Sequence, residues 1–486
     1  MDFFTLKYGL FSDTSDLLHN VPLLLKMKDR FPRYVARAEK AQMMGRRIAR
    51  EVLLPKVLEI DTKCQEDPSY LDWELFSELN KRKALTGFVP EKMGGLGWSA
   101  LDCFAFIEES FTACVGLSAW YLFNLFGVAC AFVEFKPEIC IKILQDMAKA
   151  QDEGRPLSFA WSITEPSAGT DAEDPVAMST MKPSAFAKKV PGGYIINGRK
   201  QFITNGDLAH YVVATISTDP ERPASDVMGT FFIPTTSKGF SVERLEHKCG
   251  HKAKHTAALV FDDVFVPDKH IWEEPGRGLR HTREILSITR GVVGMLGLGN
   301  ARGALERCIQ FAYQKKVGGH RLIDENWVQI AIADMLKDIM VIRTKCFEFA
   351  IALDKLHVFR ILENIPAKAA LKILPGSLLM NESLQGLVSP AWISRAISRF
   401  KHSLVTDEIM EYFASQGSAL KAAGTDMAMD VASRVLDITG IEGMAYRFGM
   451  EKIYRDAKAS QIYEGSNQAN KIDLFIHEIG EVIGSC

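Results

Sequence analysis

The amino-acid sequence predicts an α+β protein in which helical and strand-forming domains follow one another along the chain. Apolar residues recur at three- and four-residue steps over 34–157, and helical periodicity returns over 276–486. Between them, over 158–275, short β-branched and aromatic runs are separated by turn residues. Residues 1–33 form an N-terminal extension, and the order of the three domains is therefore helical, strand-rich and helical.

The composition is that of a globular protein without a strong net charge. Of 486 residues, 47% are hydrophobic and 24% are charged, and the formal net charge is −2. No global basic excess is present, so we expect no nucleic-acid partner. The nine cysteines form no C-x-x-C pair, and the chain shows neither a secretory signal nor a run of about 18 apolar residues. We therefore expect a cytoplasmic protein with reduced thiols and no transmembrane segment.

The first helical domain and the strand-rich domain are marked by different periods. RYVARAEKAQMMGRRIAREVLLPKVLEI and DWELFSELNKRKA place charged residues between apolar ones at helical spacing. The strands are predicted in LSFAWSIT, GGYIINGRKQFIT, HYVVATIS, GTFFIPT and LVFDDVFVP, which read as successive antiparallel strands. Two Asn-Gly pairs, at 197–198 and 205–206, predict turns on either side of the strand that ends at Thr204.

Two motifs in the chain favour structural roles. GLGNARG, residues 297–303, lies inside a helical run and lacks the glycine spacing of a dinucleotide loop, so its small residues predict close helix packing. HKAKH, residues 251–255, would present a metal-compatible pair of histidines only on a helix, and it lies in a strand-rich stretch. We therefore expect no metal site.

Two other motifs indicate a ligand site. SITEPSAGTD, residues 162–171, follows a strand and can offer hydroxyls and backbone N–H groups to a polar or phosphate-bearing ligand, or it is a hydroxyl-rich turn. In QIYEGSNQAN, residues 461–470, Gly465 can end one helix and Ser466 can cap the next. Glu464 would then lie at a helix corner with its carboxylate in a cleft, the alternative being a solvated glutamate.

The order of the motifs PEKMGGLG, SITEPSAGTD, INGRKQFITNG, FDDVFVP and RDAKASQIYEGSNQ resembles the acyl-CoA dehydrogenase family. The resemblance covers Tyr34 to the C-terminus, apart from an insertion at about 357–416. It implies an N-terminal α-helical domain, a middle antiparallel β-barrel domain and a C-terminal four-helix bundle. It also implies FAD as cofactor, an acyl-CoA substrate, an electron-transfer flavoprotein as acceptor, and a homodimer or homotetramer acting in fatty acid or carboxylic acid degradation.

The resemblance assigns roles to individual residues. Glu464 would be the base that removes the α-proton of the acyl-CoA while flavin N5 accepts the β-hydrogen as hydride. Arg290 and Gly465 would bind the substrate. The implied FAD contacts are Trp161, Ile163, Thr164, Thr170, Phe202, Thr204, Gly440, Ser466 and Gln468. Some branches of the family place the base just before the helix arginine, but here that position is Thr289, which cannot serve as a base.

Two segments depart from the family pattern. KKVGG, residues 315–319, has Val317 and Gly318 where the family usually has a hydroxyl and an aromatic residue that reach the neighbouring subunit's FAD. TGIEG keeps Gly440 and Gly443 but places Ile441 between them. The alternatives are an oxygen-using relative, such as an acyl-CoA oxidase or flavin monooxygenase, and a non-catalytic homologue that acts as a binding protein. The acyl group, whether straight, branched, cyclic or aromatic, is not specified by the sequence.

The insertion at about 357–416 is too apolar for a disordered linker. Three prolines divide it, which predicts short helices. Their apolar faces are expected to bury against the body or a second subunit, and they include Leu371, Leu374, Leu378 and Leu379. The alternative is an elaboration that only thickens the bundle.

Overall fold

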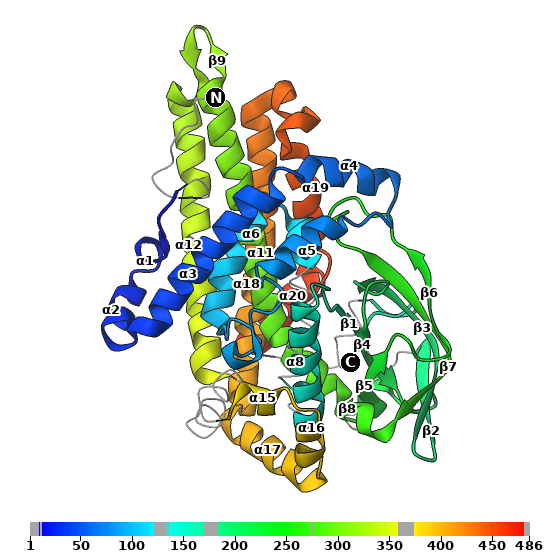
Figure 1. Ribbon diagram of the computed structural model, residues 1–486. Helices are drawn as coiled ribbons and strands as arrows, with labels where there is room; N and C mark the ends of the chain where they lie inside the picture. Colours follow the sequence, from blue (N-terminus) through cyan, green and yellow to red (C-terminus); the bar gives the residue numbers. More distant parts are fainter. Residues whose placement is uncertain are drawn as a thin grey trace.

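The computed structural model describes residues 12–120, 136–169, 183–273, 276–357 and 374–480, together with Gly9 and Val133. The predicted α+β class is confirmed, because helical N-terminal and C-terminal regions enclose a strand-rich region of the sequence that folds as one curled sheet (Figure 1). In Figure 1 the long C-terminal helices stand beside the N-terminal helices, and the sheet lies to their right.

The N-terminal helices begin where the sequence satisfies or removes their first N–H groups. Both α3 (Pro32–Ile48) and α8 (Pro137–Asp152) start with proline, which lacks the N–H that would be left unpaired there. A capping box of Ser99 and Asp102 starts α6 (Ala100–Ala113), which is buried along its whole length. The other N-terminal elements are α1 (Leu17–Asn20), α2 (Leu23–Arg30), the π-helical turn η1 (Ala49–Leu53), α4 (Val57–Glu66), α5 (Trp73–Lys81) and η2 (Glu91–Met93).

The sheet has eight strands in the order β6-β7-β3-β2-β4-β5-β8, with β1 paired to β4. The β1–β4 and β2–β4 pairs are parallel, and the other pairs in the sheet are antiparallel. The sequence did not predict β2, β6 or β8. The strands are β1 (Phe159–Ser162), β2 (Ala185–Val190), β3 (Gly193–Thr204), β4 (Tyr211–Ser217), β5 (Met228–Pro234), β6 (Phe240–Leu245), β7 (Thr256–Pro267) and β8 (Ile271–Glu273), with short helices α10 (Ala224–Val227) and η4 (Asp268–His270) between them.

One predicted turn is wrong. Asn197 and Gly198 lie inside β3, where the pairing with β7 shifts register and Gly198 has φ of 125°. The chain turns earlier, between Val190 and Gly193, which are paired across β2 and β3. Gly198 therefore bends one long strand that pairs on both sides, a use of glycine that the local sequence does not distinguish from a turn. The second Asn-Gly pair, at 205–206, follows β3 as predicted.

The C-terminal bundle is built on two 37-residue helices, α11 (Gly278–Gln314) and α18 (Asp407–Gly443). Close helix packing by GLGNARG is confirmed: a Cβ on Gly297 would meet the backbone of α18, and one on Gly299 or Gly303 would meet α6. The bundle also contains α12 (Asn326–Leu356) and α20 (Asn467–Ile479), together with α19 (Met450–Ser460), the turns η5 (Leu322–Asp324) and η6 (Tyr446–Phe448), and a hairpin of β9 (Lys316–Val317) and β10 (His320–Arg321).

The described part of the insertion folds onto the N-terminal domain. It contains α15 (Gly376–Leu379), α16 (Ser383–Val388) and α17 (Ala391–Leu404). Leu379 is buried, and Leu374 and Leu378 are half-buried, while Leu371 lies outside the described residues. The Gln145 side chain of α8 donates to the carbonyls of Leu379 (2.8 Å) and Asn381 (3.1 Å). The insertion therefore buries Leu379 of α15 against the body of the protein, whereas α16 has no fully buried residue.

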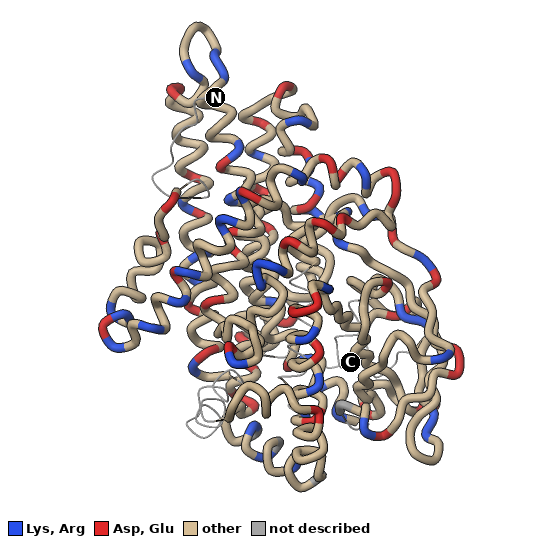
Figure 2. Tube along the Cα trace, in the orientation of Figure 1, with Lys and Arg blue, Asp and Glu red and all other residues tan. Residues whose placement is uncertain are grey.

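The charged residues are spread over the fold. Figure 2 shows basic and acidic positions interleaved along most helices, without a large face of one sign. Among the described residues, no helix is long and apolar enough to cross a membrane.

Candidate active site

The corner between α19 and α20 holds Glu464 in an unusual backbone conformation. Glu464 has φ of 56° and Gly465 has φ of 74°, so two successive residues adopt the left-handed region. Ser466 ends the corner by accepting the N–H of Ala469 (3.3 Å), which confirms its predicted role as the cap of α20. A non-glycine residue with positive φ is rare and must be supported by its surroundings.

Two buried side chains supply this support. The Lys421 ammonium of α18 donates to the carbonyl of Gly465 (2.6 Å) and to Oδ1 of Asn467 (2.6 Å). The Asn470 amide donates to the carbonyls of residues 464–466 at distances of 3.0 to 3.2 Å. The corner is therefore tied to both α18 and α20, which fixes the direction in which the Glu464 side chain leaves the backbone.

The Glu464 carboxylate points toward α11. Its Oε2 accepts a hydrogen bond from the Thr289 hydroxyl at 2.7 Å, and the residue is partly buried. Burial raises the pKa of this carboxyl above its usual range, while the Thr289 hydrogen bond and the charges of Arg290, Lys254 and Lys421 oppose the rise. A partly desolvated carboxylate held by one hydroxyl has the properties of a general base.

Arg290 is engaged inside the bundle. Its Nη1 donates to Asp473 (2.7 Å) and to Ser418 (2.9 Å), and the residue is only 7% exposed. The guanidinium lies beside the corner, where its charge reaches Glu464. Binding of the substrate by Arg290 and Gly465 stays a prediction.

The end of β1 carries buried polar atoms that have no partner among the described residues, of the kind that a ligand would satisfy. The Trp161 indole Nε1 and the Ser162 hydroxyl are buried and have no hydrogen-bond partner among the residues that the structure describes. The carbonyl of Ile163 accepts from Lys200 (2.7 Å), and that of Thr164 accepts from the N–H of Gln201 (3.0 Å), which joins the residues after β1 to β3. A buried donor without an acceptor costs about 1–3 kcal/mol, so these atoms favour an additional polar group here.

The end of β3 presents an aromatic ring. Phe202 has φ of 56° and is 55% exposed, within the register shift between Lys200 and Ile203. Two residues later, the Thr204 hydroxyl accepts a hydrogen bond from Lys254 (3.2 Å). An exposed ring, a nearby hydroxyl and the unpaired Trp161 donor are groups suited to a flat heteroaromatic ligand with polar edges, so these residues fit a flavin.

The other predicted FAD contacts include Gly440, Gln468 and Thr170. Gly440 breaks α18 with φ of 58° and ψ of −159°, and the neighbouring Ile441 is 90% exposed. Gln468 is exposed in the first turn of α20. Thr170 lies outside the described residues. The roles of these residues and of Ser466 in FAD binding stay predictions.

Lys254 joins the two halves of the candidate site, and sequence reasoning missed it. Its ammonium contacts Thr204 on the β3 side and lies 4.5 Å from the ring centre of Tyr463, next to Glu464. Lys421 was missed too. The only signal in the sequence is that each lysine lies among small or apolar residues, in KAKHTAAL and SALKAAG. In HKAKH, His251 contacts Asp456, and His255 contacts Asp207.

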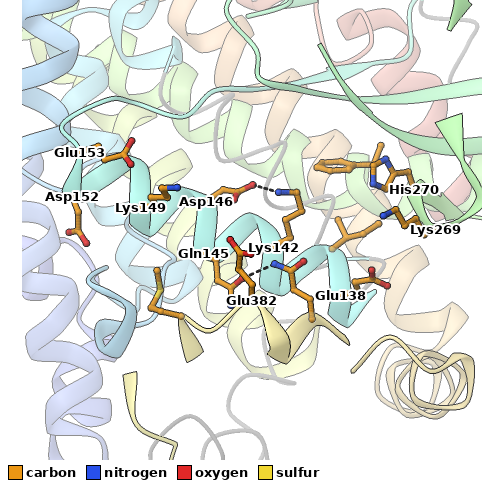
Figure 3. A pocket seen from close by; sticks show the side chains of 14 residues that line it. Glu138, Lys142, Gln145, Asp146, Lys149, Asp152, Glu153, Lys269, His270 and Glu382 are labelled. Atoms are coloured by element: carbon orange, nitrogen blue, oxygen red, sulfur yellow. Dashed lines mark hydrogen bonds and ion pairs between the residues drawn. The ribbon is translucent and has the colours of Figure 1, made fainter. Parts of the chain in front are cut away.

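A separate pocket of about 560 Å³ lies between α8, the sheet and α16 (Figure 3). In Figure 3 Lys142 pairs with Asp146. The Gln385 amide of the insertion donates to the Gln145 side chain at 2.8 Å. Its lining is mixed in charge, and it includes none of the predicted site residues. The pocket is therefore distinct from the corner and the end of β3.

Comparison with known protein families identifies the class of protein to which this chain belongs. Sequence models of the acyl-CoA dehydrogenase N-terminal, middle and C-terminal domains match residues 36–150, 160–264, and 276–374 with 390–474. The chain belongs to the acyl-CoA dehydrogenase family, whose members are FAD-dependent enzymes, and the predicted cofactor, FAD, is confirmed at this level.

Individual relatives are distant but span nearly the whole chain. The probable acyl-CoA dehydrogenase of Mycobacterium tuberculosis is 26% identical over 88% of this chain and 91% of its own length. The cyclohex-1-ene-1-carbonyl-CoA dehydrogenase of Syntrophus aciditrophicus is 26% identical over 88% and 86%, respectively. The solved glutaryl-CoA dehydrogenase of Mycobacterium smegmatis in complex with FADH2 has a TM-score of 0.67 and 19% identity, covering 91% of this chain and 95% of that chain. It shares the fold.

Proposed function

We propose that this protein is an acyl-CoA dehydrogenase that converts an acyl-CoA thioester to the 2-enoyl-CoA, with Glu464 as the base. The observation that carries the proposal is that the end of β3 and the corner at Glu464, which are far apart in the sequence, both contact one residue. Lys254 touches both Thr204 at the end of β3 and Tyr463 at the corner. The candidate flavin contacts and the candidate base therefore share one site, which is what removal of two hydrogens from adjacent carbons needs.

Glu464 would take the α-proton, and FAD, when bound, would accept the β-hydrogen with its electron pair. Burial raises the pKa of Glu464 and so makes its carboxylate a stronger base toward a weakly acidic C–H group. The Thr289 hydroxyl holds the carboxylate in one orientation. Positioned base catalysis contributes about 10²–10⁴-fold, and alignment of the substrate supplies a further part of the acceleration.

The proposed partners are an acyl-CoA, an electron-transfer flavoprotein as acceptor and further copies of this chain, and the proposed location is cytoplasmic. Self-association is supported by apolar side chains exposed on the bundle. On α20 they are Ile472, Phe475, Ile476 and Ile479, and on α12 they include Trp327, Ile330, Met340 and Val341. Apolar surface of this extent on one bundle favours a protein interface.

The deciding experiment is anaerobic mixing of the purified, FAD-loaded protein with a panel of straight, branched, cyclic and aromatic acyl-CoA thioesters. We expect loss of the flavin absorbance near its visible maximum with at least one member, and formation of the matching 2-enoyl-CoA. Reoxidation should be rapid with an electron-transfer flavoprotein and slow with oxygen. Rapid reoxidation by oxygen would indicate an oxidase or monooxygenase, and a protein that stays colourless after addition of FAD would indicate a non-catalytic homologue.

A further inference from the structure

Lys254 is a buried lysine within the candidate active site. It is 4% exposed and lies in the connection between β6 and β7. Its Nζ donates to the Thr204 hydroxyl oxygen at 3.2 Å and stands 4.5 Å from the centre of the Tyr463 ring. A lysine is almost never buried without a specific electrostatic reason, because desolvation of an ammonium is costly.

The charges that face Lys254 come from two elements. Glu464, at the corner, is an opposite charge that acts on Lys254, and Lys248, whose ammonium donates to the carbonyl of Lys254 at 2.8 Å, is a like charge. Burial, followed by the repulsion from Lys248, lowers the pKa of Lys254 to about 7, and Glu464 opposes this decrease. The carboxylate proposed as the base therefore favours the ammonium form of Lys254.

Dehydrogenation changes the charge of that base. The α-C–H bond breaks and its proton passes to Glu464, the β-C–H bond breaks with its electron pair going to the cofactor, and the C=C bond forms. The carboxylate is thereby neutralised, and one negative charge appears on the flavin side of the site. A cation held between the carboxylate and the flavin stabilises the negative charge after it has moved to the flavin, and the protein need not reorganise.

We propose that Lys254 is a positioning residue of the dehydrogenation site that orients the Thr204 hydroxyl toward the flavin and provides the counter-charge for the reduced cofactor. The inference rests on the proposed function. Because Lys254 donates to the Thr204 oxygen, the hydroxyl proton of Thr204 is directed away from Lys254 and is available to the ring edge that this residue is predicted to contact. The other buried lysine, Lys421, has a different role, because its ammonium donates to carbonyl and amide oxygens that build the corner.

The test compares Lys254→Met, which removes charge and donor, Lys254→Gln, which keeps a donor, and Lys254→Arg, which keeps the charge. Lys252→Met is the matched control, because it removes the same charge from a side chain two residues away that contacts His247. The two-electron midpoint potential of the bound flavin is measured by anaerobic titration with dithionite and a reference dye. Affinities for oxidised and reduced FAD are measured in parallel, so that weakly bound variants are also compared.

Lys254→Met and Lys254→Gln should each weaken the affinity for reduced FAD about tenfold relative to oxidised FAD, which lowers the two-electron potential by about 30 mV. Lys254→Arg and Lys252→Met should stay within about threefold of the parent. Equal potentials in the parent, Met and Gln proteins would overturn the proposal, as would failure of all three Lys254 variants to fold. Because the reductant is chemical, this result is independent of acyl-CoA turnover. A parent protein that binds FAD but oxidises no acyl-CoA would instead contradict the proposed function.

Discussion

The hydroxyl of Thr289 donates a 2.7 Å hydrogen bond to the carboxylate of Glu464, although 175 positions separate them in the sequence. Thr289 lies on α11, just before Arg290, at the position where some branches of the family place their base. The two positions are therefore adjacent in space and face the same site. A hydroxyl at one of them can tune a carboxylate at the other, since a hydrogen bond to the charged form of an acid lowers its pKa.

The first prediction concerns the pH dependence of this pair. Glu464 must be ionised to accept a proton, so the rate of flavin reduction by acyl-CoA should rise with pH through a pKa above the usual glutamate range. Thr289→Val removes the hydrogen bond that stabilises the carboxylate, and it should move this pKa upward by about one unit. Stopped-flow measurement of flavin bleaching across pH gives both values.

Thr289→Ser is the matched control, because it keeps the hydroxyl and should leave the pH profile in place. A Thr289→Val profile that coincides with that of the parent would show that Glu464 is not the group that titrates.

The second prediction addresses the base itself. Glu464→Gln preserves the shape of the side chain and can still accept the Thr289 hydrogen bond, but it cannot accept the substrate proton. The variant should fold, retain FAD and lose at least about 100-fold in the rate of flavin reduction by acyl-CoA. Reduction by dithionite should be unchanged. Bleaching by acyl-CoA at the parental rate would exclude Glu464 as the base.

The corner was predictable because its signals are local. Gly465 supplies a left-handed residue, although α19 already ends at Ser460, and Ser466 caps the next helix, so the local sequence indicates a sharp change of direction. The period of the apolar residues likewise distinguished the helical domains from the sheet. The turn predicted at Asn197-Gly198 is wrong because it also rested on local sequence alone. Pairing of β3 with β7 keeps the strand continuous there, and a residue pair does not reveal that pairing.

Lys254 and Lys421 could not be predicted because burial of a lysine is decided by distant partners. The acceptors of Lys421 lie about 40 residues away, on the corner. The acceptor of Lys254 lies 50 residues earlier, on β3. Without these partners each lysine reads as solvated, which is the usual state of its residue type. The same holds for Arg290, whose partner Asp473 lies on another helix.

The third prediction concerns the hairpin of β9 and β10. It stands at the end of α11, away from the sheet (Figure 1), and Val317 is 51% exposed. Nothing lies within 4 Å of a Cβ built on Gly318, so a larger side chain fits, although its φ of 58° disfavours one. Val317→Thr with Gly318→Phe should lower the dissociation constant for FAD about fivefold, by one hydrogen bond of about 1 kcal/mol and an aromatic contact from a neighbouring subunit.

Fluorescence titration with FAD measures this change. Val317→Thr alone is informative, because it avoids the strained position. An affinity that is unchanged or weaker in both variants would contradict a contribution of this hairpin to a neighbouring subunit's cofactor.

The fourth prediction concerns the attachment of the insertion. Gln145 donates to the carbonyls of Leu379 and Asn381 and accepts from Gln385 at 2.8 Å, so one buried side chain holds both α15 and α16. Gln145→Ala leaves these groups without their partner and should cost about 1–3 kcal/mol in the stability of this attachment. Limited proteolysis should then cut within 376–404 sooner than in the parent, whereas Gln385→Ala, which removes one of the three hydrogen bonds, should have a smaller effect.

If the insertion serves an interface or the docking of the electron acceptor, Gln145→Ala should also alter oligomer size or turnover with the flavoprotein acceptor, while acyl-CoA still bleaches the flavin. Faster proteolysis with unchanged size and turnover would instead identify the insertion as a thickening of the bundle, and unchanged proteolysis would contradict the role of Gln145 in holding it.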